Sequence, residues 1–179
     1  MIKEIAARKS VRKYNDKPVD DKEIIQLIES ARLAPSGSNT QPWNFIIIRS
    51  EETKEEIVKA DGNQMWMKSA PVFIACVADI RCRIKNEVEL SLDEKSSLRE
   101  LKAIIRDTAI AIEHILLEAE HIGLSSCWTA YFDQADIRPI LDIPSDKYVV
   151  GIITIGYADI DTKPAPRRSL ESMIRYEKW

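Results

Sequence analysis

Hydrophobic residues recur every three or four positions in several parts of the chain, and this spacing predicts the helices. The clearest pattern runs from Leu101 to Ile122, and its apolar stripe is broad. Because a broad stripe contacts neighbours on several sides, we expect this helix to lie at the centre of the core. Gly123 follows directly, where a glycine commonly ends a helix.

A second helix is predicted from its end signals. Asp20 and Glu23 have the spacing of a capping box, and Pro35 ends the helical pattern. Its apolar face would be formed by Ile24, Leu27, Ile28 and Ala31. Shorter helices are expected over residues 2–7, 51–60 and 134–141.

Three segments have the character of strands. Phe45 to Arg49 is rich in β-branched residues. Val72 to Ala78 is a continuous apolar run of strand length, which predicts a buried strand. Tyr148 to Gly156 is the third. Since helices and strands alternate only partly along the chain, the pattern predicts an α+β fold built on one sheet.

Length and composition agree with a single domain over residues 1–179. Hydrophobic residues make up 45% of the chain and charged residues 31%, a balance typical of globular proteins. Residues 81–98 are polar and irregular, which indicates a surface insertion or a lid. Residues 158–179 are expected to form an extended C-terminal arm.

Charge and hydropathy exclude several classes of function. The net charge is -3, whereas nucleic-acid-binding modules usually carry a basic excess. No apolar run approaches the roughly 20 residues that cross a bilayer, and the N-terminus lacks the apolar run of a signal peptide. Three cysteines without a CxxC pair indicate reduced thiols in a cytoplasmic protein, with no disulfide framework and no zinc site.

The common catalytic motifs are missing. The five glycines form neither GxGxxG nor a P-loop, and no GxSxG or HExxH is present. Glu118 and His121 form one Glu-x-x-His pair, but a di-iron site needs two such pairs and further glutamates. We therefore interpret His114 and His121 as structural and predict neither a metal site nor a catalytic side chain.

A cation-rich segment lies near the N-terminus. If it is extended, alternate residues point the same way, so two guanidiniums would converge with hydroxyl groups. Such a set suits a phosphate, because arginine offers forked donors; a solvated basic turn is the alternative. The residues concerned are Arg8, Ser10, Arg12 and Tyr14.

Two other segments carry polar groups suited to a ligand. The loop over residues 34–43 offers hydroxyls and amides, and it follows a helix end, where ligand sites often lie; a polar connector is the alternative. In the C-terminal arm, prolines at 164 and 166 stiffen the chain before Arg167 and Arg168. This arrangement suits a second phosphate contact, with a disordered basic tail as the alternative.

In this order and spacing, the segments resemble the nitroreductase family of flavoproteins. The family's Arg-x-Ser-x-Arg pattern is present at residues 8–12, and its Pro-Ser-x-x-Asn-x-Gln-Pro-Trp loop at residues 35–43. A Gly-Leu-x-x-Cys-Trp turn follows at residues 123–128. The arm, at residues 164–168, resembles the family's closing Pro-x-x-Arg segment with its second basic residue. The resemblance covers nearly the whole chain.

The resemblance implies a nitroreductase-like α/β sandwich, with a mostly antiparallel sheet flanked by helices. It also implies an intertwined homodimer with two FMN sites at its interface, with Ser36 and Asn39 approaching the flavin from the other subunit. Such a shared site predicts that an isolated monomer exposes apolar surface. The cofactor-binding residues implied are Arg8, Lys9, Ser10, Arg12, Ser36, Asn39, Gln41, Ala130, Tyr131, Arg167 and Arg168.

One part of the implied site departs from the family pattern. The backbone at Ala130 and Tyr131 would face the flavin N5 region, where the family often has a glycine. This chain has Thr129, Ala130 and Tyr131 instead, so the Tyr131 ring is expected to narrow the pocket.

The implied activity is that of an FMN-dependent NAD(P)H oxidoreductase. NADH or NADPH would give a hydride to the flavin and leave, and a nitroaromatic or quinone acceptor would then enter the same pocket. The flavin carries this chemistry, so no catalytic side chain is required. A same-fold reductive dehalogenase or flavin-degrading enzyme, and a non-enzymatic FMN-binding sensor, are the alternatives.

The expected insertion has two interpretations. Arg81, Arg83 and Lys85 either meet an anionic acceptor or form a solvated surface run. The first interpretation would make residues 81–98 the determinant of acceptor choice.

Overall fold

A computed structural model describes residues 1–85 and 89–179; residues 86–88 of the expected insertion lie outside the described residues. Four strands form one sheet in the order β1-β2-β4-β3, and each pair of neighbours is antiparallel. This confirms the predicted α+β class and antiparallel sheet. The strands are β1 (Trp43–Ile48), β2 (Val72–Asp79), β3 (Ser125–Thr129) and β4 (Lys147–Gly156).

The five predicted helices are present, with ends that match their sequence signals. The helices are α1 (Lys3–Ala7), α2 (Asp21–Arg32), α3 (Glu51–Ala60), α4 (Arg99–His121) and α5 (Gln134–Ile140). The capping box of α2 is formed by Asp20 and Glu23 as predicted. After α4, Gly123 has a φ of 82°, a conformation that glycine adopts without a steric cost.

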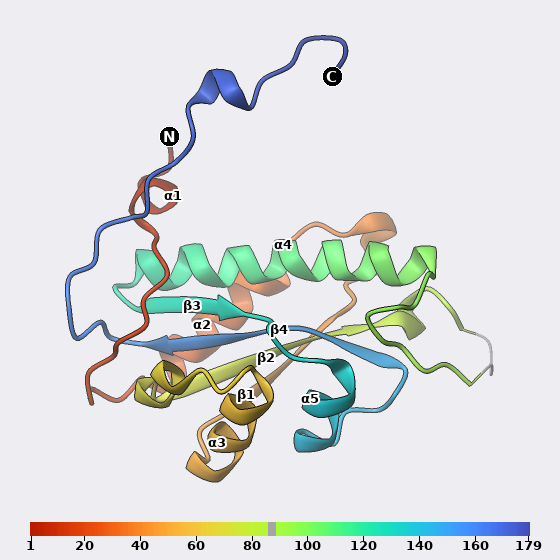
Figure 1. The fold of residues 1–179 in the computed structure, drawn as a ribbon, viewed down its shortest axis with the longest axis horizontal. Coiled ribbons are helices and arrows are strands. Elements are labelled where there is room, and N and C mark those ends of the chain that lie inside the picture. The colour runs from red at the N-terminus through yellow and green to blue at the C-terminus, as the bar shows by residue number, and fades with distance from the viewer. Residues whose placement is uncertain (86–88) are drawn as a thin grey trace.

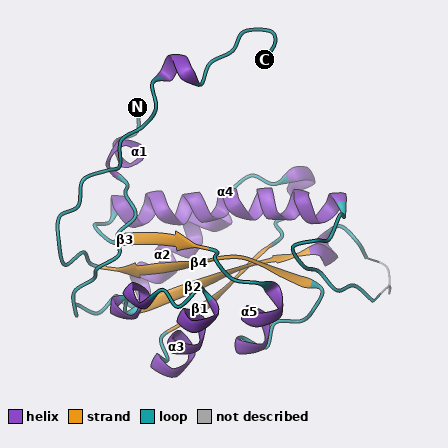
Figure 2. Cartoon of the chain, in the orientation of Figure 1, coloured by secondary structure: helices purple, strands orange, loops and turns teal. Residues whose placement is uncertain are grey.

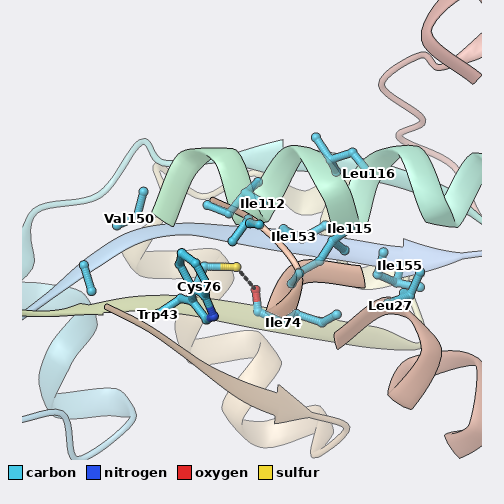
Figure 3. Close-up of a cluster of buried hydrophobic side chains, with 14 of the residues drawn as sticks. Leu27, Trp43, Ile74, Cys76, Ile112, Ile115, Leu116, Val150, Ile153 and Ile155 are labelled. Atoms are coloured by element: carbon cyan, nitrogen blue, oxygen red, sulfur yellow. Dashed lines mark hydrogen bonds between the residues drawn. The ribbon is translucent and has the colours of Figure 1, made fainter. Parts of the chain in front are cut away.

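Helices cover both faces of the sheet (Figures 1 and 2). Alternate residues of β2 divide between two apolar clusters, because successive side chains of a strand point to opposite faces. Ile74 and Cys76 face α2 and α4, as Figure 3 shows for the larger cluster. Phe73 and Ala75 face the other cluster, which contains residues of α3 and α5. As predicted, β2 is buried on both faces. The apolar face of α4 is part of the larger cluster, but the helix lies on one face of the sheet and its outer side, with Arg106 and Ile110, is exposed, so the prediction that it lies at the centre of the core was wrong.

One strand was not predicted. Residues 123–128 were expected to form a turn, but β3 pairs with β4 along Ser125–Thr129. This strand is only five residues long and begins with two serines, so it lacks the apolar alternation that identifies strands. Its burial comes instead from α4, which packs over it.

The two ends of the chain lie close to one edge of the sheet. Val11 donates its amide to the Ser126 carbonyl at 3.0 Å, and Tyr14 pairs with Ala158 just after β4. Beyond this point the C-terminal arm leaves the body of the molecule (Figure 1), and every residue from 163 to 179 is exposed. Among the described residues, no helix is long and apolar enough to span a membrane.

Candidate functional site

The N-terminal basic segment is held against the free edge of β3. A bridge joins Ser10 to Ser126, and the side chain of Val11 is 1% exposed. We call residues 8–12 together with β3 the platform. Because backbone hydrogen bonds and a buried side chain fix the segment, the orientation of its polar residues is set within the chain itself.

Three of the predicted site residues gather around the Cys127 thiol. Burial raises the pKa of Cys127, while Arg12, a hydrogen bond with Ser10 and then Arg8 act in the opposite direction. These residues also follow one another along the edge of β3, where Ser10 bridges to Ser126 and the Val11 amide bonds to the Ser126 carbonyl. The structure therefore brings Arg8, Ser10 and Arg12 together on the platform.

The platform retains positive charge that its own chain does not neutralise. The Arg12 side chain is exposed, and its guanidinium lies 5.6 Å from the centre of the Trp66 ring. Within residues 1–85 and 89–179, Arg12 forms no ion pair. The ion pair that Arg8 forms among the described residues is long, 3.8 Å from its Nε to Glu113 Oε1. This arrangement fits an anionic group such as a phosphate.

Two neighbours of these residues point elsewhere. The expectation that Tyr14 faces the same way as the arginines was wrong. Its hydroxyl donates to the Val11 carbonyl at 2.8 Å and lies 2.7 Å from Thr154 Oγ1, and burial raises its pKa. Both Val11 and Tyr14 are buried, so the segment does not keep a strict alternation. Lys9 lies apart from the cluster, with its Nζ 3.2 Å from Asp161 at the base of the arm.

A buried carboxylate supports the end of β3. Asp61 is 0% exposed, and its Oδ2 accepts hydrogen bonds from Thr129 Oγ1 at 2.6 Å and Gln64 Nε2 at 2.8 Å. Its Oδ1 accepts the Tyr131 amide at 2.6 Å. The Tyr131 amide is thus engaged inside the chain, whereas its ring is 77% exposed. Ala130, between these two anchored residues, is exposed.

The same network reaches the platform arginine. Trp66 Nε1 donates to Gln64 Oε1 at 3.0 Å, and Arg12 lies over the Trp66 ring. A continuous set of contacts therefore links Arg12 to the segment at residues 129–131. Sequence reasoning missed Asp61, Gln64 and Trp66, because Asp-Gly-Asn is an ordinary turn sequence and nothing in it signals a buried carboxylate.

The second part of the site is the loop at residues 36–41. Three of its non-glycine residues have positive φ: Ser38 at 55°, Asn39 at 53° and Gln41 at 47°. Ser36 Oγ accepts the Gln41 amide at 2.9 Å, and Gln41 Nε2 donates to the Asn39 carbonyl at 3.2 Å. Gln41 thus shapes the loop, while the Asn39 side-chain amide has no hydrogen-bond partner in the described part of the chain.

The loop and the platform do not meet within one chain. Gly37 contacts α4 at Asp107, and Arg8 contacts α4 at Glu113. Positions six residues apart on a helix point roughly 120° away from each other, so the two contacts lie on different sides of α4. Figure 1 shows the loop near the start of α4 and the N-terminal segment toward its other end.

The remaining predicted residues lie outside both parts. Arg167 and Arg168 are exposed on the arm, which leaves the body beside Lys9. In the expected insertion, Arg81 Nε lies 2.6 Å from Asp146 Oδ2 and Arg83 Nη2 lies 2.8 Å from Asp107 Oδ2. Both arginines are therefore ion-paired within the chain, and only Lys85 is exposed.

The histidines have structural contacts. His114 Nδ1 lies 3.0 Å from the Ser30 carbonyl, and His121 Nδ1 lies 2.7 Å from Glu4 Oε1. These contacts attach α2 and α1 to α4. No cluster of potential metal ligands is found among the residues that the structure describes.

This chain resembles a described protein family, several known proteins and several solved structures. A family model described as "Nitroreductase family" matches residues 5–157. A protein of Archaeoglobus fulgidus is 29% identical, over 99% of this chain and 98% of its own length. The FMN reductase (NAD(P)H) of Bacillus subtilis is 26% identical, over 100% of this chain and 74% of its own. The structure of an FMN-dependent nitroreductase from Clostridium difficile R20291 has a TM-score of 0.80 and 27% identity, with both chains covered completely.

Proposed function

The chain belongs to the nitroreductase family, and we propose that it is an FMN-dependent NAD(P)H oxidoreductase that reduces a nitroaromatic or quinone-like acceptor. The B. subtilis FMN reductase and the C. difficile FMN-dependent nitroreductase support the cofactor and the electron donor. A cytoplasmic setting agrees with three cysteines that are all free.

The platform is the observation that carries this proposal. A phosphate monoester has about two negative charges at neutral pH, and the platform carries two arginines and a serine on one short segment at the edge of β3. Arg12 has no carboxylate partner among the described residues, so its forked donors are available to the phosphate of FMN. Arg167 and Arg168 would add to this site from the exposed C-terminal arm, which begins next to the platform.

A second copy of the chain would complete the site. The strand β1 is an edge of the sheet, with Ile47 39% exposed, and the arm carries exposed apolar residues such as Leu170 and Met173. Free strand edges and exposed apolar side chains are typical of surfaces that bind another chain. In a homodimer, Ser36 and Asn39 of one copy would then reach the flavin held by the platform of the other.

The protein's own residues bind and orient. Bound FMN would supply the hydride-transfer chemistry between NADH or NADPH and the acceptor. Arg8, Ser10 and Arg12 would hold the phosphate, and Ser36 and Asn39 would contact the polar edge of the ring system.

The segment at residues 129–131 would limit the pocket. Asp61 fixes its backbone through Thr129 and the Tyr131 amide, so the segment keeps one shape when substrates exchange. The exposed Tyr131 ring would narrow the entrance and favour flat acceptors. Nitroaromatic compounds and quinones have that shape.

An anaerobic absorbance spectrum of the FMN-reconstituted protein tests the proposal. We expect the flavin band to bleach on addition of NADH or NADPH and to recover on addition of a nitroaromatic or a quinone. A bound flavin that neither nucleotide bleaches would favour a dehalogenase, a flavin-degrading enzyme or a sensor. Failure to bind FMN at all would refute the proposal.

A further inference from the structure

One ion pair engages both backbone polar groups of Gly37 in the 36–41 loop. Arg83 Nη2 donates to Asp107 Oδ2 at 2.8 Å and to the Gly37 carbonyl at 3.1 Å. The Gly37 amide donates to the same Asp107 oxygen at 3.2 Å. The side chains of Arg83 and Asp107 are only 20% and 14% exposed, so water competes weakly for these contacts.

The residue before Arg83 contacts the same loop. Burial raises the pKa of the Cys82 thiol, and a hydrogen bond with Thr40 opposes this effect. Thr40 Oγ1 in turn donates to the Gly37 carbonyl at 3.1 Å. The segment after β2 therefore touches the loop near both of its ends.

The glycine at position 37 leaves room for this contact. A Cβ atom there would lie 2.7 Å from Arg83 Nη2 and 3.7 Å from Asp107 Oδ2. Real Cβ atoms do not approach other atoms so closely, so any larger residue would displace the guanidinium. The absence of a Cβ atom at Gly37 thus leaves space for the Arg83 guanidinium.

The loop needs such support because its backbone is unfavourable. Ser38, Asn39 and Gln41 all have positive φ, a region in which residues with a Cβ are rarely found. Conformations of this kind persist only when the surroundings hold them. Within the described residues, the contacts with Arg83 and Asp107 are those that tie this loop to other segments by side-chain hydrogen bonds.

We propose that Arg83 and Asp107 are positioning residues that hold the 36–41 loop in the shape in which Ser36 and Asn39 meet the flavin. Arg83 then serves to brace the cofactor loop and does not bind the acceptor. The role toward the flavin rests on the proposed function. The bracing itself rests only on contacts within this chain.

Hydrogen exchange of the flavin-free protein tests the brace directly. In Asp107→Ala and Arg83→Met, we expect backbone amides of residues 36–41 to exchange about tenfold faster or more. The matched control is Asp146→Ala, which also removes a carboxylate paired with an arginine of this segment, 2.6 Å from Arg81 Nε. Exchange that is unchanged in the first two variants, or equally fast in the control, would overturn the proposal.

FMN affinity, from quenching of flavin fluorescence, tests the positioning role. We expect Asp107→Ala and Arg83→Met to bind FMN about tenfold more weakly, Arg83→Lys to recover part of the loss, and Asp146→Ala to match the wild type. Unchanged affinity in variants with a loosened loop would overturn the positioning role alone. A wild-type protein that binds no FMN would refute the proposed function, and the positioning role with it.

Discussion

The two halves of the proposed site are held in different ways. The platform is anchored by backbone hydrogen bonds to β3, by the buried Val11 and by a network that ends on the fully buried Asp61. The 36–41 loop has an unfavourable backbone and depends on a partly exposed ion pair. The platform is thus anchored in the core of the molecule, whereas the 36–41 loop is attached to its surface.

Because of this difference, we expect substitutions in the two halves to affect different properties of the protein. Buried hydrogen-bonding groups contribute to the stability of the whole fold, because an unpaired buried donor is costly. A surface loop opens locally, with little effect on global unfolding. Changes beneath the platform should therefore lower the free energy of unfolding, whereas changes at the loop should mainly weaken FMN binding.

The largest effect on stability is expected for Asp61→Ala. The Thr129 hydroxyl and the Tyr131 amide would lose their acceptor, whereas Gln64 Nε2 would keep its bond to Thr129 Oγ1 at 2.8 Å. Each unsatisfied donor that is shielded from water costs about 1–3 kcal/mol. We expect a loss of about 3 kcal/mol or more in the free energy of unfolding, measured in urea. Asp61→Asn keeps one acceptor oxygen and should lose less. A loss below about 1 kcal/mol in the alanine variant would show that the network does not support the platform.

The largest effect on cofactor binding is expected for Arg12→Ala. A hydrogen bond to a charged group contributes about 1.5–3 kcal/mol, so FMN affinity should fall about 10- to 100-fold with little change in stability. The control is Lys13→Ala, on the same segment, whose Nζ lies 2.6 Å from Asp159. Equal losses in the two variants would indicate a general effect of charge and would argue against a phosphate contact at Arg12.

A smaller effect is expected for Gly37→Ala. The added Cβ would displace Arg83, so FMN affinity should fall severalfold while the free energy of unfolding changes by less than about 1 kcal/mol. Fluorescence titration and urea unfolding of the same preparation measure both quantities. A global loss of stability as large as that of Asp61→Ala would remove the distinction between the two halves.

The smallest effect on stability is expected for the contact between α1, which precedes the platform, and His121 of α4. A hydrogen bond with His121 holds the pKa of Glu4 below its ordinary value of 4.5. A lowered carboxyl pKa stabilises the fold above pH 4.5, and this contribution is lost as pH falls through the folded-state pKa. The difference in melting temperature between wild type and His121→Ala should therefore shrink below pH 4.5. A difference that stays constant from pH 6 to pH 3 would contradict this role.

Sequence patterns predicted most of the fold, because α2, α4 and β2 each have a strong apolar period or a distinct end signal. The strand β3 was missed because a short strand with two serines has no such period. The Arg8, Ser10 and Arg12 cluster was predicted from alternation, but the same argument misplaced Tyr14, since the buried Val11 and Tyr14 interrupt that alternation.

Pairings between distant residues could not be predicted in the same way. Asp61 meets Tyr131, and Arg83 meets Asp107, only after the chain has folded. A charged residue in a turn or on a helix looks the same in the sequence whether it is solvated or paired. The supports of both halves of the site therefore became visible only in the structure.

The central claim is that each flavin site combines the platform of one copy with the 36–41 loop of another. It is tested by pairing Arg8→Ala/Arg12→Ala with Ser36→Ala/Asn39→Ala in a heterodimer isolated with two affinity tags. Each variant alone should bind no FMN. In the heterodimer, one site would combine both defects and the other would be intact, so FMN content should return to about half that of the wild type. A heterodimer without FMN, as expected if one chain supplied the whole site, would contradict the account.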